Sequence, residues 1–222
     1  MKILNLISYI SFQSPELFEK FKDDEILTIS PLTDPNLDNF IKCEIGSLSY
    51  VLAMIASEIS TEFSDFDTGL LSGESSVGEE EIPEILEFIK DLDYVLIDEN
   101  AIKFHADKVN MEHFLNLIAK DAQILGLNGS KIEFKNTKFN ELKELQSFDG
   151  AVVLKHTKNL NFVGGPYFSM SSKLKDGDEV EISGVKRVFK LDKNLKGTVA
   201  LLGVESVNSY IYEVAKFSKV QR

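Results

Sequence analysis

The stretch KLKDGDEVEISGVKRVFKLDKNLKGTVALL, residues 173–202, decides the fold of the second half of the chain. Branched apolar residues such as Val180 precede Ser183-Gly184, and Val185 continues the same pattern after it. Branched residues on both sides of a two-residue connection that contains glycine predict a β-hairpin. A third apolar run follows at residues 198–202. The stretch therefore predicts three short strands of a small barrel or sandwich.

The residues before this stretch alternate between strand and helix patterns. Runs of branched residues predict strands, while apolar residues spaced three and four apart after a polar cap predict helices. The expected strands are 3–10, 25–29, 94–97, 131–134 and 151–154, and the expected helices start at Ser14-Pro15, Ser47, a Ser76-x-x-Glu79 capping box and Asn110. Residues 31–39 and 65–76 are expected to be loops, and 139–145 a short helix or a linker.

The character of the sequence changes near residue 148. The alternation of strands and helices before it predicts an α/β layered domain over residues 1–148. The pattern after it stays close to the two-residue period of strands, which predicts a small β-rich, barrel-like domain over residues 149–222.

Charge excludes some classes of partner. The chain has 222 residues, of which 24 are Lys or Arg and 36 are Asp or Glu, for a formal net charge of −12. An acidic surface repels phosphate backbones, so nucleic-acid binding is not expected. No run approaches the roughly 20 apolar residues of a membrane-spanning helix, and the apolar stretch 1–12 is expected to be a buried strand, not a signal peptide.

The residues that could hold metals or perform catalysis are few. Cys43 is the single cysteine, which fits a reducing cytoplasm and cannot form an internal disulfide or hold an iron–sulfur cluster alone. His105, His113 and His156 lack the spacing of a zinc site. We therefore expect no metal or other cofactor in this chain, and no autonomous catalytic site.

Two glycine clusters deserve comparison with phosphate-binding loops. Gly73 and Gly78 have the spacing of a P-loop, but Glu79 and Glu80 follow where that motif needs Lys and Ser or Thr. A loop that leads into a capped helix explains this segment better. Gly164-Gly165-Pro166 lacks the dinucleotide-binding spacing and is expected to be a tight turn.

Several segments resemble a known family. KDGDEV at 175–180 and KGTVAL at 196–201 resemble the C-terminal domain of the molybdopterin oxidoreductase superfamily and, more closely, the large iron–sulfur subunit of respiratory complex I. FIKCEIGS at 40–47 and GLLSGESSVGEE at 69–80 are similar to segments in the middle of that subunit. YIYEV at 210–214 fits a terminal strand there.

The resemblance implies a short peripheral-arm subunit of a complex I-type NADH-quinone oxidoreductase, of the kind that replaces the NADH-binding chain in some bacteria. Such a chain would be cytoplasmic, attached to the inner membrane only through the complex, and would serve respiratory electron transport. Its partners would be the large iron–sulfur subunit and other peripheral-arm subunits. The glycine-rich NADH and flavin loop and the cluster-ligating cysteines of the authentic NADH-binding chain are absent, so NADH oxidation by this chain is not expected.

Two alternatives remain open at the level of sequence. The chain could be a flavin-binding electron-entry module that accepts electrons from a donor other than NADH, or a free-standing interaction protein of molybdopterin-fold descent. For the docking role, Tyr210, Tyr212 and Phe217 are the candidate interface residues, because aromatic residues dominate interface energetics. The competing interpretation is that these three residues complete the β-rich core.

Overall fold

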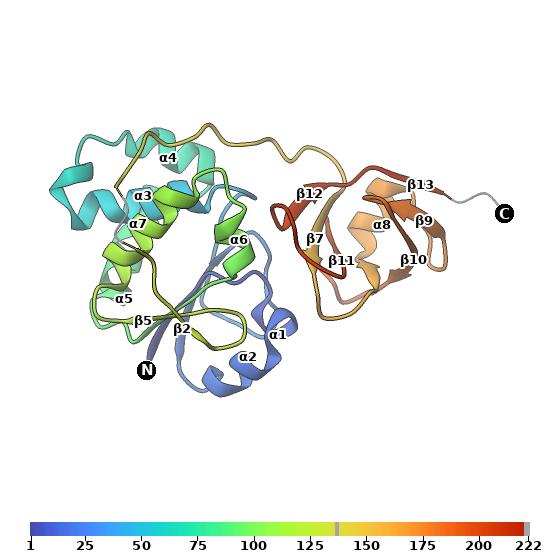
Figure 1. The fold of residues 1–222 in the computed structure, drawn as a ribbon, viewed down its shortest axis with the longest axis horizontal. Helices are drawn as coiled ribbons and strands as arrows, with labels where there is room; N and C mark the ends of the chain where they lie inside the picture. The colour runs from blue at the N-terminus through green and yellow to red at the C-terminus, as the bar shows by residue number, and fades with distance from the viewer. Residues whose placement is uncertain (136–137, 220–222) are drawn as a thin grey trace. The chain divides into compact units, whose positions relative to one another are not determined.

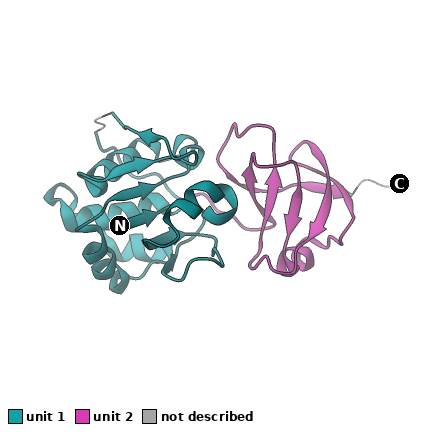
Figure 2. Cartoon of the chain, turned by 90° about the horizontal axis from the view of Figure 1, so that it is seen from below, with its two compact units in different colours: residues 1–145 teal, residues 146–222 magenta. Residues whose placement is uncertain are grey.

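The chain folds into two compact units (Figure 2). The computed structural model describes residues 1–135 and 138–219. Unit 1 spans Met1–Leu145 and unit 2 spans Gln146–Arg222, whereas the sequence places this division between residues 148 and 149. The predicted fold class, an α/β part followed by a β-rich part, is confirmed.

Unit 1 is built on a six-stranded sheet with the order β3-β2-β1-β4-β5-β6. The first five strands in this order are parallel, and β6 is antiparallel to β5. The strands are β1 (Lys2–Asn5), β2 (Glu25–Ser30), β3 (Phe40–Lys42), β4 (Tyr94–Leu96), β5 (Gln123–Leu125) and β6 (Lys131–Ile132). The order reverses between β1 and β4, so this is a doubly wound sheet with its topological switch point there.

Helices cover both faces of this sheet (Figure 1). They are α1 (Ile10–Gln13), α2 (Pro15–Phe21), α3 (Leu48–Ile59), α4 (Thr68–Ser75), α5 (Ile82–Ile89), α6 (Glu99–Lys103) and α7 (Lys108–Ala119), with the 3-10 turns η1 (Thr61–Phe63) and η2 (Glu79–Glu81). Successive strand residues point to opposite faces. Leu4 and Leu27 therefore join the core beneath α3, α5 and α7, while Ile3 and Ile26 join the core on the α1 and α2 side.

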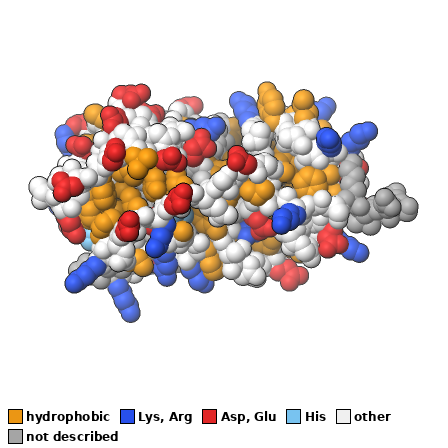
Figure 3. All heavy atoms as spheres, turned by 90° about the horizontal axis from the view of Figure 1, so that it is seen from above, with side chains coloured by type: hydrophobic (Ala, Val, Ile, Leu, Met, Phe, Trp, Pro, Cys, Tyr) orange, Lys and Arg blue, Asp and Glu red, His pale blue; other side chains and the backbone are white. Residues whose placement is uncertain are grey.

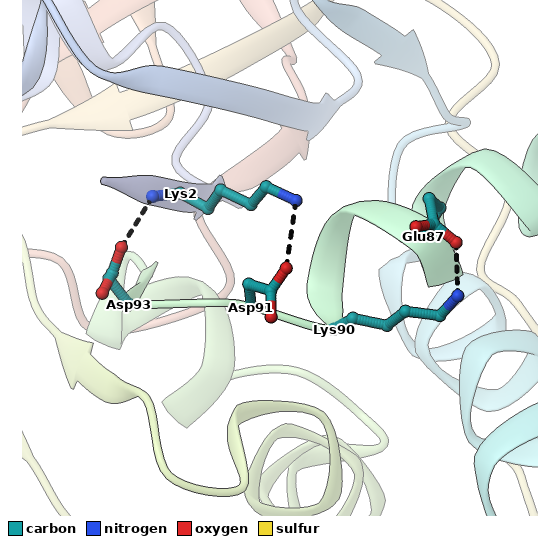
Figure 4. Close-up of polar contacts among 5 residues, drawn as sticks. All are labelled: Lys2, Glu87, Lys90, Asp91 and Asp93. Atoms are coloured by element: carbon teal, nitrogen blue, oxygen red, sulfur yellow. Dashed lines mark hydrogen bonds and ion pairs between the residues drawn. The ribbon is translucent and has the colours of Figure 1, made fainter.

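Acidic residues fix the amino end of the central strands (Figure 4). The backbone N–H of Lys2 donates to Asp93, at 2.8 Å, and its ammonium lies 3.7 Å from Asp91. Lys90 and Glu87 form a further ion pair at the end of α5. The two contacts of Lys2 tie the start of β1 to the turn before β4, which helps set the register of the two strands.

Unit 2 contains a seven-stranded mixed sheet with the order β12-β7-β11-β8-β10-β9-β13. Its elements are β7 (Val152–His156), β8 (Phe162–Gly164), α8 (Pro166–Ser172), β9 (Glu179–Ile182), β10 (Val185–Leu191), β11 (Val199–Gly203), β12 (Tyr212–Val214) and β13 (Phe217–Lys219). The sheet curls around the rings of Phe162, Phe168 and Phe189, whose centroids lie 5.2–6.0 Å apart.

The predicted hairpin is present. Ile182 and Val185 pair across it, and the two connecting residues Ser183 and Gly184 both have positive φ angles, of 49° and 78°. Positive φ at both positions is the requirement of the turn whose twist matches that of the flanking strands.

Five local predictions are wrong. The apolar stretch 1–12, with its expected strand 3–10, is not one strand, because β1 ends at Asn5 and Ile10 begins α1. Residues 65–76 are not all loop, because Asp67 accepts a hydrogen bond from the N–H of Leu70 and starts α4. Ser76 lies beyond the end of α4 in the left-handed region, and the box-like contact runs instead from the N–H of Gly78 to Glu81. The other two errors are at Asn110, which lies inside α7 and not at its start, and at Gly164-Gly165-Pro166, where Pro166 begins α8.

Candidate functional site

The carboxyl edge of the unit 1 sheet contains the switch point, which is where doubly wound folds bind ligands. The loops that meet there are held together by their own side chains. Asn5 accepts from the N–H of Ile7 and donates to Thr28, and Asp34 accepts from the N–H and hydroxyl of Ser11. Asn5 and Asp34 are both buried. Their hydrogen-bonding capacity serves the loops themselves.

The turn after β1 does not fit a dinucleotide. In this fold that turn carries the glycines that let backbone N–H groups approach a pyrophosphate. Here it carries the buried side chains of Leu6 and Ile7, and Tyr9 adopts a left-handed conformation with φ of 55°. The residues present at the turn therefore do not fit a pyrophosphate-containing cofactor.

Asp98 is a buried carboxylic acid at this edge. It follows β4 and accepts hydrogen bonds from the N–H groups of Asn100 and Ala101 as the cap of α6. Burial raises the pKa of its carboxyl to about 6, against the opposing effect of those two N–H groups. The folded protein therefore binds the Asp98 proton more tightly than the unfolded chain does.

We expect Asp98→Asn to stabilise the protein above pH 6. The raised pKa means that the stabilising contribution of wild-type Asp98 is complete below pH 4 and is lost as the pH rises through about 6, by on the order of 3 kcal/mol. Asparagine keeps a cap acceptor but carries no charge, so the variant should lose this pH dependence. Thermal unfolding between pH 4 and pH 8 measures the effect, with the exposed cap variant Asp67→Asn as control. Parallel curves for wild type and Asp98→Asn would contradict the expectation.

A second feature of unit 1 is the segment 138–145, which crosses α3 and α7 in an extended conformation (Figure 1). We call this segment the strap. Phe139, Leu142 and Leu145, spaced three residues apart, pack against the core beneath it. The sequence leaves this segment open between a short helix and a linker, and the structure shows neither helix nor strand there.

Side chains of unit 1 hold the backbone of the strap. Asn110 accepts from the N–H of Asn140 at 2.8 Å and lies 3.4 Å from the carbonyl oxygen of Glu141. Asp107 accepts from the N–H of Lys143 at 2.9 Å. The hydroxyl of Tyr50 donates to the carbonyl oxygen of that same residue at 3.2 Å. Hydrogen bonds to backbone atoms fix the path of the strap whatever its side chains are.

An aromatic cluster lies under the strap. The ring of Phe63 is 5.3 Å from both Phe66 and Phe139, 5.4 Å from Phe114 and 5.6 Å from His113. Aromatic pairs at such separations add stability beyond the area they bury. Phe63 thus joins the turn after α3, helix α7 and the strap into one packed unit.

Beside the strap, unit 1 has an open pocket with a volume of about 440 Å³. Apolar side chains make up most of its wall, and two carboxylates stand among them. The lining residues are Tyr50, Phe66, Asp67, Leu70, Leu71, Phe139, Glu141 and Leu142. Leu70, at the edge of the pocket, is 56% exposed. We take the strap and this pocket as the candidate functional site.

The predicted interface residues lie elsewhere, in unit 2. Tyr210 is half-buried, its ring is 6.0 Å from that of Tyr212, and Tyr212 is only 4% exposed. Phe217 is half-buried and packs against the core of unit 2. Whether the three residues contact a partner stays a prediction.

Cys43 and two of the three histidines also have definite places. Burial raises the pKa of the Cys43 thiol to about 12, so the thiol stays protonated. His105 contacts the carbonyl oxygen of Gly46 at 2.9 Å and accepts from the N–H of Asp107. Burial lowers the pKa of both His105 and His156, that of His156 to about 4, and both are therefore neutral at physiological pH.

Sequence reasoning missed Tyr50, Asp107 and Asn110 as a functional group. The only signal in the sequence is Asn110, a polar residue among apolar ones near the start of an expected helix. A role as helix cap explains that residue equally well. Only the fold brings these three residues next to the strap.

Comparison with known proteins adds no family: no protein-family model and no curated protein matches the chain. Over residues 1–135 and 138–219, no helix is both long and apolar enough to cross a membrane. Within the same part of the chain, no group of three or more His, Cys, Asp and Glu side chains is arranged to hold a metal ion.

Proposed function

We propose that this chain is a docking subunit in the peripheral arm of a complex I-type respiratory quinone oxidoreductase, on the cytoplasmic side of the inner membrane. The observation that carries the docking role is the open apolar pocket of unit 1, with Leu70 exposed at its edge. Exposed apolar surface rimmed by polar groups marks interaction sites. A docking role requires neither catalytic residues nor a cofactor in the chain itself.

The resemblance supports the choice of complex. Its two most characteristic segments lie in unit 2. Residues 175–180 form the turn into β9, where Asp176 accepts from the N–H of Leu191 and Asp178 from that of Lys175. Residues 196–201 lead into β11, which lies between β7 and β8. The resembling residues therefore include two aspartates that hold the turn before β9 and three residues that lie buried in β11.

The polar groups at the switch point support docking over electron entry. Asn5, Asp34 and Asp98 hydrogen-bond to neighbouring loops and to the cap of α6, which explains their burial without a ligand. The alternative of a flavin-binding module has no specific observation in its favour.

We expect a tagged copy of the chain to recover the large iron–sulfur subunit and other peripheral-arm subunits from detergent-solubilised membranes of its host. Quinone reductase activity of the same extract serves as the control that the complex remained intact. Recovery of the tagged chain without any complex I subunit from such an extract would overturn the proposed function.

A further inference from the structure

The pocket beside the strap has a floor and a rim of different chemistry. Its floor is apolar, with the rings of Phe66 and Phe139 in contact at 5.4 Å. Its charged members are Asp67 and Glu141, both exposed. Figure 3 shows hydrophobic side chains with acidic ones around them on the face of unit 1 that carries α4 and the strap.

More carboxylates surround this pocket than its lining alone contains. The pKa of Tyr50 is raised by burial first, and then by the nearby carboxylates of Asp107, Glu74 and Glu144. Within the described ranges, no Lys, Arg or His forms an ion pair with Glu74, Glu141 or Glu144. The three glutamates at the rim therefore form no ion pair with any cation of the described residues.

Unit 1 as a whole also has more acidic than basic residues. Residues 1–145 contain 12 Lys and Arg against 28 Asp and Glu, whereas residues 146–222 contain 12 against 8. The acidity of the chain is thus concentrated in the unit that carries the pocket. The negative electrostatic potential of unit 1 attracts positively charged surfaces and repels acidic ones.

We infer that the pocket beside the strap binds a polypeptide segment of a partner subunit that presents one large apolar side chain flanked by Lys or Arg. The apolar side chain enters between Phe66, Leu70 and Leu142, and the cations meet Glu141 and Glu144 at the rim. This inference rests on the proposed docking function and gives it a surface and a partner chemistry.

The shape of the site favours a polypeptide over a small ligand. Small-molecule sites enclose most of their ligand and place a few polar groups inside the cavity. This pocket is open, and its carboxylates are at the exposed rim. An apolar anchor in a pocket with charges around it is the usual arrangement of a protein interface.

Site-specific cross-linking tests the inference. Cys43 is only 1% exposed, so Leu70→Cys introduces an accessible thiol at the edge of the pocket, to which benzophenone maleimide can be attached. The labelled, tagged chain is incubated with solubilised membranes of its host, irradiated and recovered. We expect an adduct with a complex I subunit, at a segment in which a large apolar residue lies within a few positions of Lys or Arg.

Charge reversal at the rim supplies the second readout. Adding Glu141→Lys and Glu144→Lys to the labelled chain should lower the adduct yield by about tenfold, since it replaces attraction by repulsion. Glu58→Lys with Glu84→Lys is the matched control, because both residues are exposed in unit 1 outside this pocket. The control has the same net charge and should retain most of the adduct.

The outcomes separate this inference from the proposed function. If the unlabelled chain recovers complex I subunits but the label at position 70 reaches none of them, the pocket is not the docking surface. An adduct with a second copy of this chain, with lipid, or with an acidic segment would also overturn the inference, as would equal yields from the two double variants. Failure of the unlabelled chain to recover the complex would instead remove the proposed function.

Discussion

Replacing Phe63 with alanine is expected to lower the free energy of unfolding of unit 1 by about 3–5 kcal/mol, the range typical of a buried phenylalanine. Phe63 is 1% exposed and its ring contacts those of Phe66, Phe114 and Phe139. The substitution removes buried apolar surface and also leaves a cavity at the point where the strap joins the core. Both effects lower the free energy of unfolding of unit 1.

Hydrogen exchange measured by mass spectrometry, together with urea denaturation, checks this expectation. Peptides from the strap and from α7 should lose protection, while peptides from unit 2 should keep theirs. Phe63→Leu should cost less than half as much, and Ser64→Ala, at an exposed neighbour, should change stability by less than about 0.5 kcal/mol. A loss below about 1 kcal/mol for Phe63→Ala, or a strap that stays protected, would show that the aromatic cluster does not hold the strap.

The substitution Gly203→Ala should disrupt unit 2 and leave unit 1 folded. A Cβ atom at this position would lie 2.0 Å from the carbonyl oxygen of Asn159 and 2.7 Å from the Cα of Leu160. Both are backbone atoms, so either β11 or the loop before β8 has to move. We expect a cost of about 3 kcal/mol or more, a large part of the stability of a small domain.

Limited proteolysis provides the measurement for Gly203→Ala, because an unfolded unit 2 should be digested to leave a fragment close to residues 1–145. The matched control is Gly73→Ala, where an added Cβ meets nothing within 4 Å. Since Gly73 lies inside α4, alanine there should stabilise the helix by about 0.5–1 kcal/mol. A digestion pattern for Gly203→Ala that matches wild type would contradict the steric argument.

Local patterns predicted the framework of the fold where one physical signal dominated. Pro15 after Ser14 predicted the start of α2, and Ser183-Gly184 between branched residues predicted the β9–β10 hairpin. The prediction failed where two explanations of a polar residue were equally good. Asp67 starts α4 in a segment whose glycines and serines predict a loop, and Asn110 binds the strap instead of capping a helix.

The candidate site was beyond sequence reasoning for a different reason. Tyr50, Asp107 and the strap residue Lys143 are brought together only by packing, and no spacing between them signals this. The pocket also depends on the strap being extended. Apolar residues at every third position fit one face of a short helix as well as an extended segment that packs on a core, so periodicity could not decide between the two.

The strap also has a consequence for how unit 1 forms during synthesis. The last strand of the parallel sheet ends at Leu125, yet Phe139 lies against Phe63, which the ribosome delivers 76 residues earlier. A nascent chain that has just completed β5 therefore displays the aromatic cluster and the apolar surface of α3 and α7 uncovered. Domains emerge from the amino end first, at about 5–20 residues per second. During the seconds between synthesis of β5 and synthesis of Leu145, the nascent chain exposes apolar surface that a chaperone can bind. The strap then covers this surface.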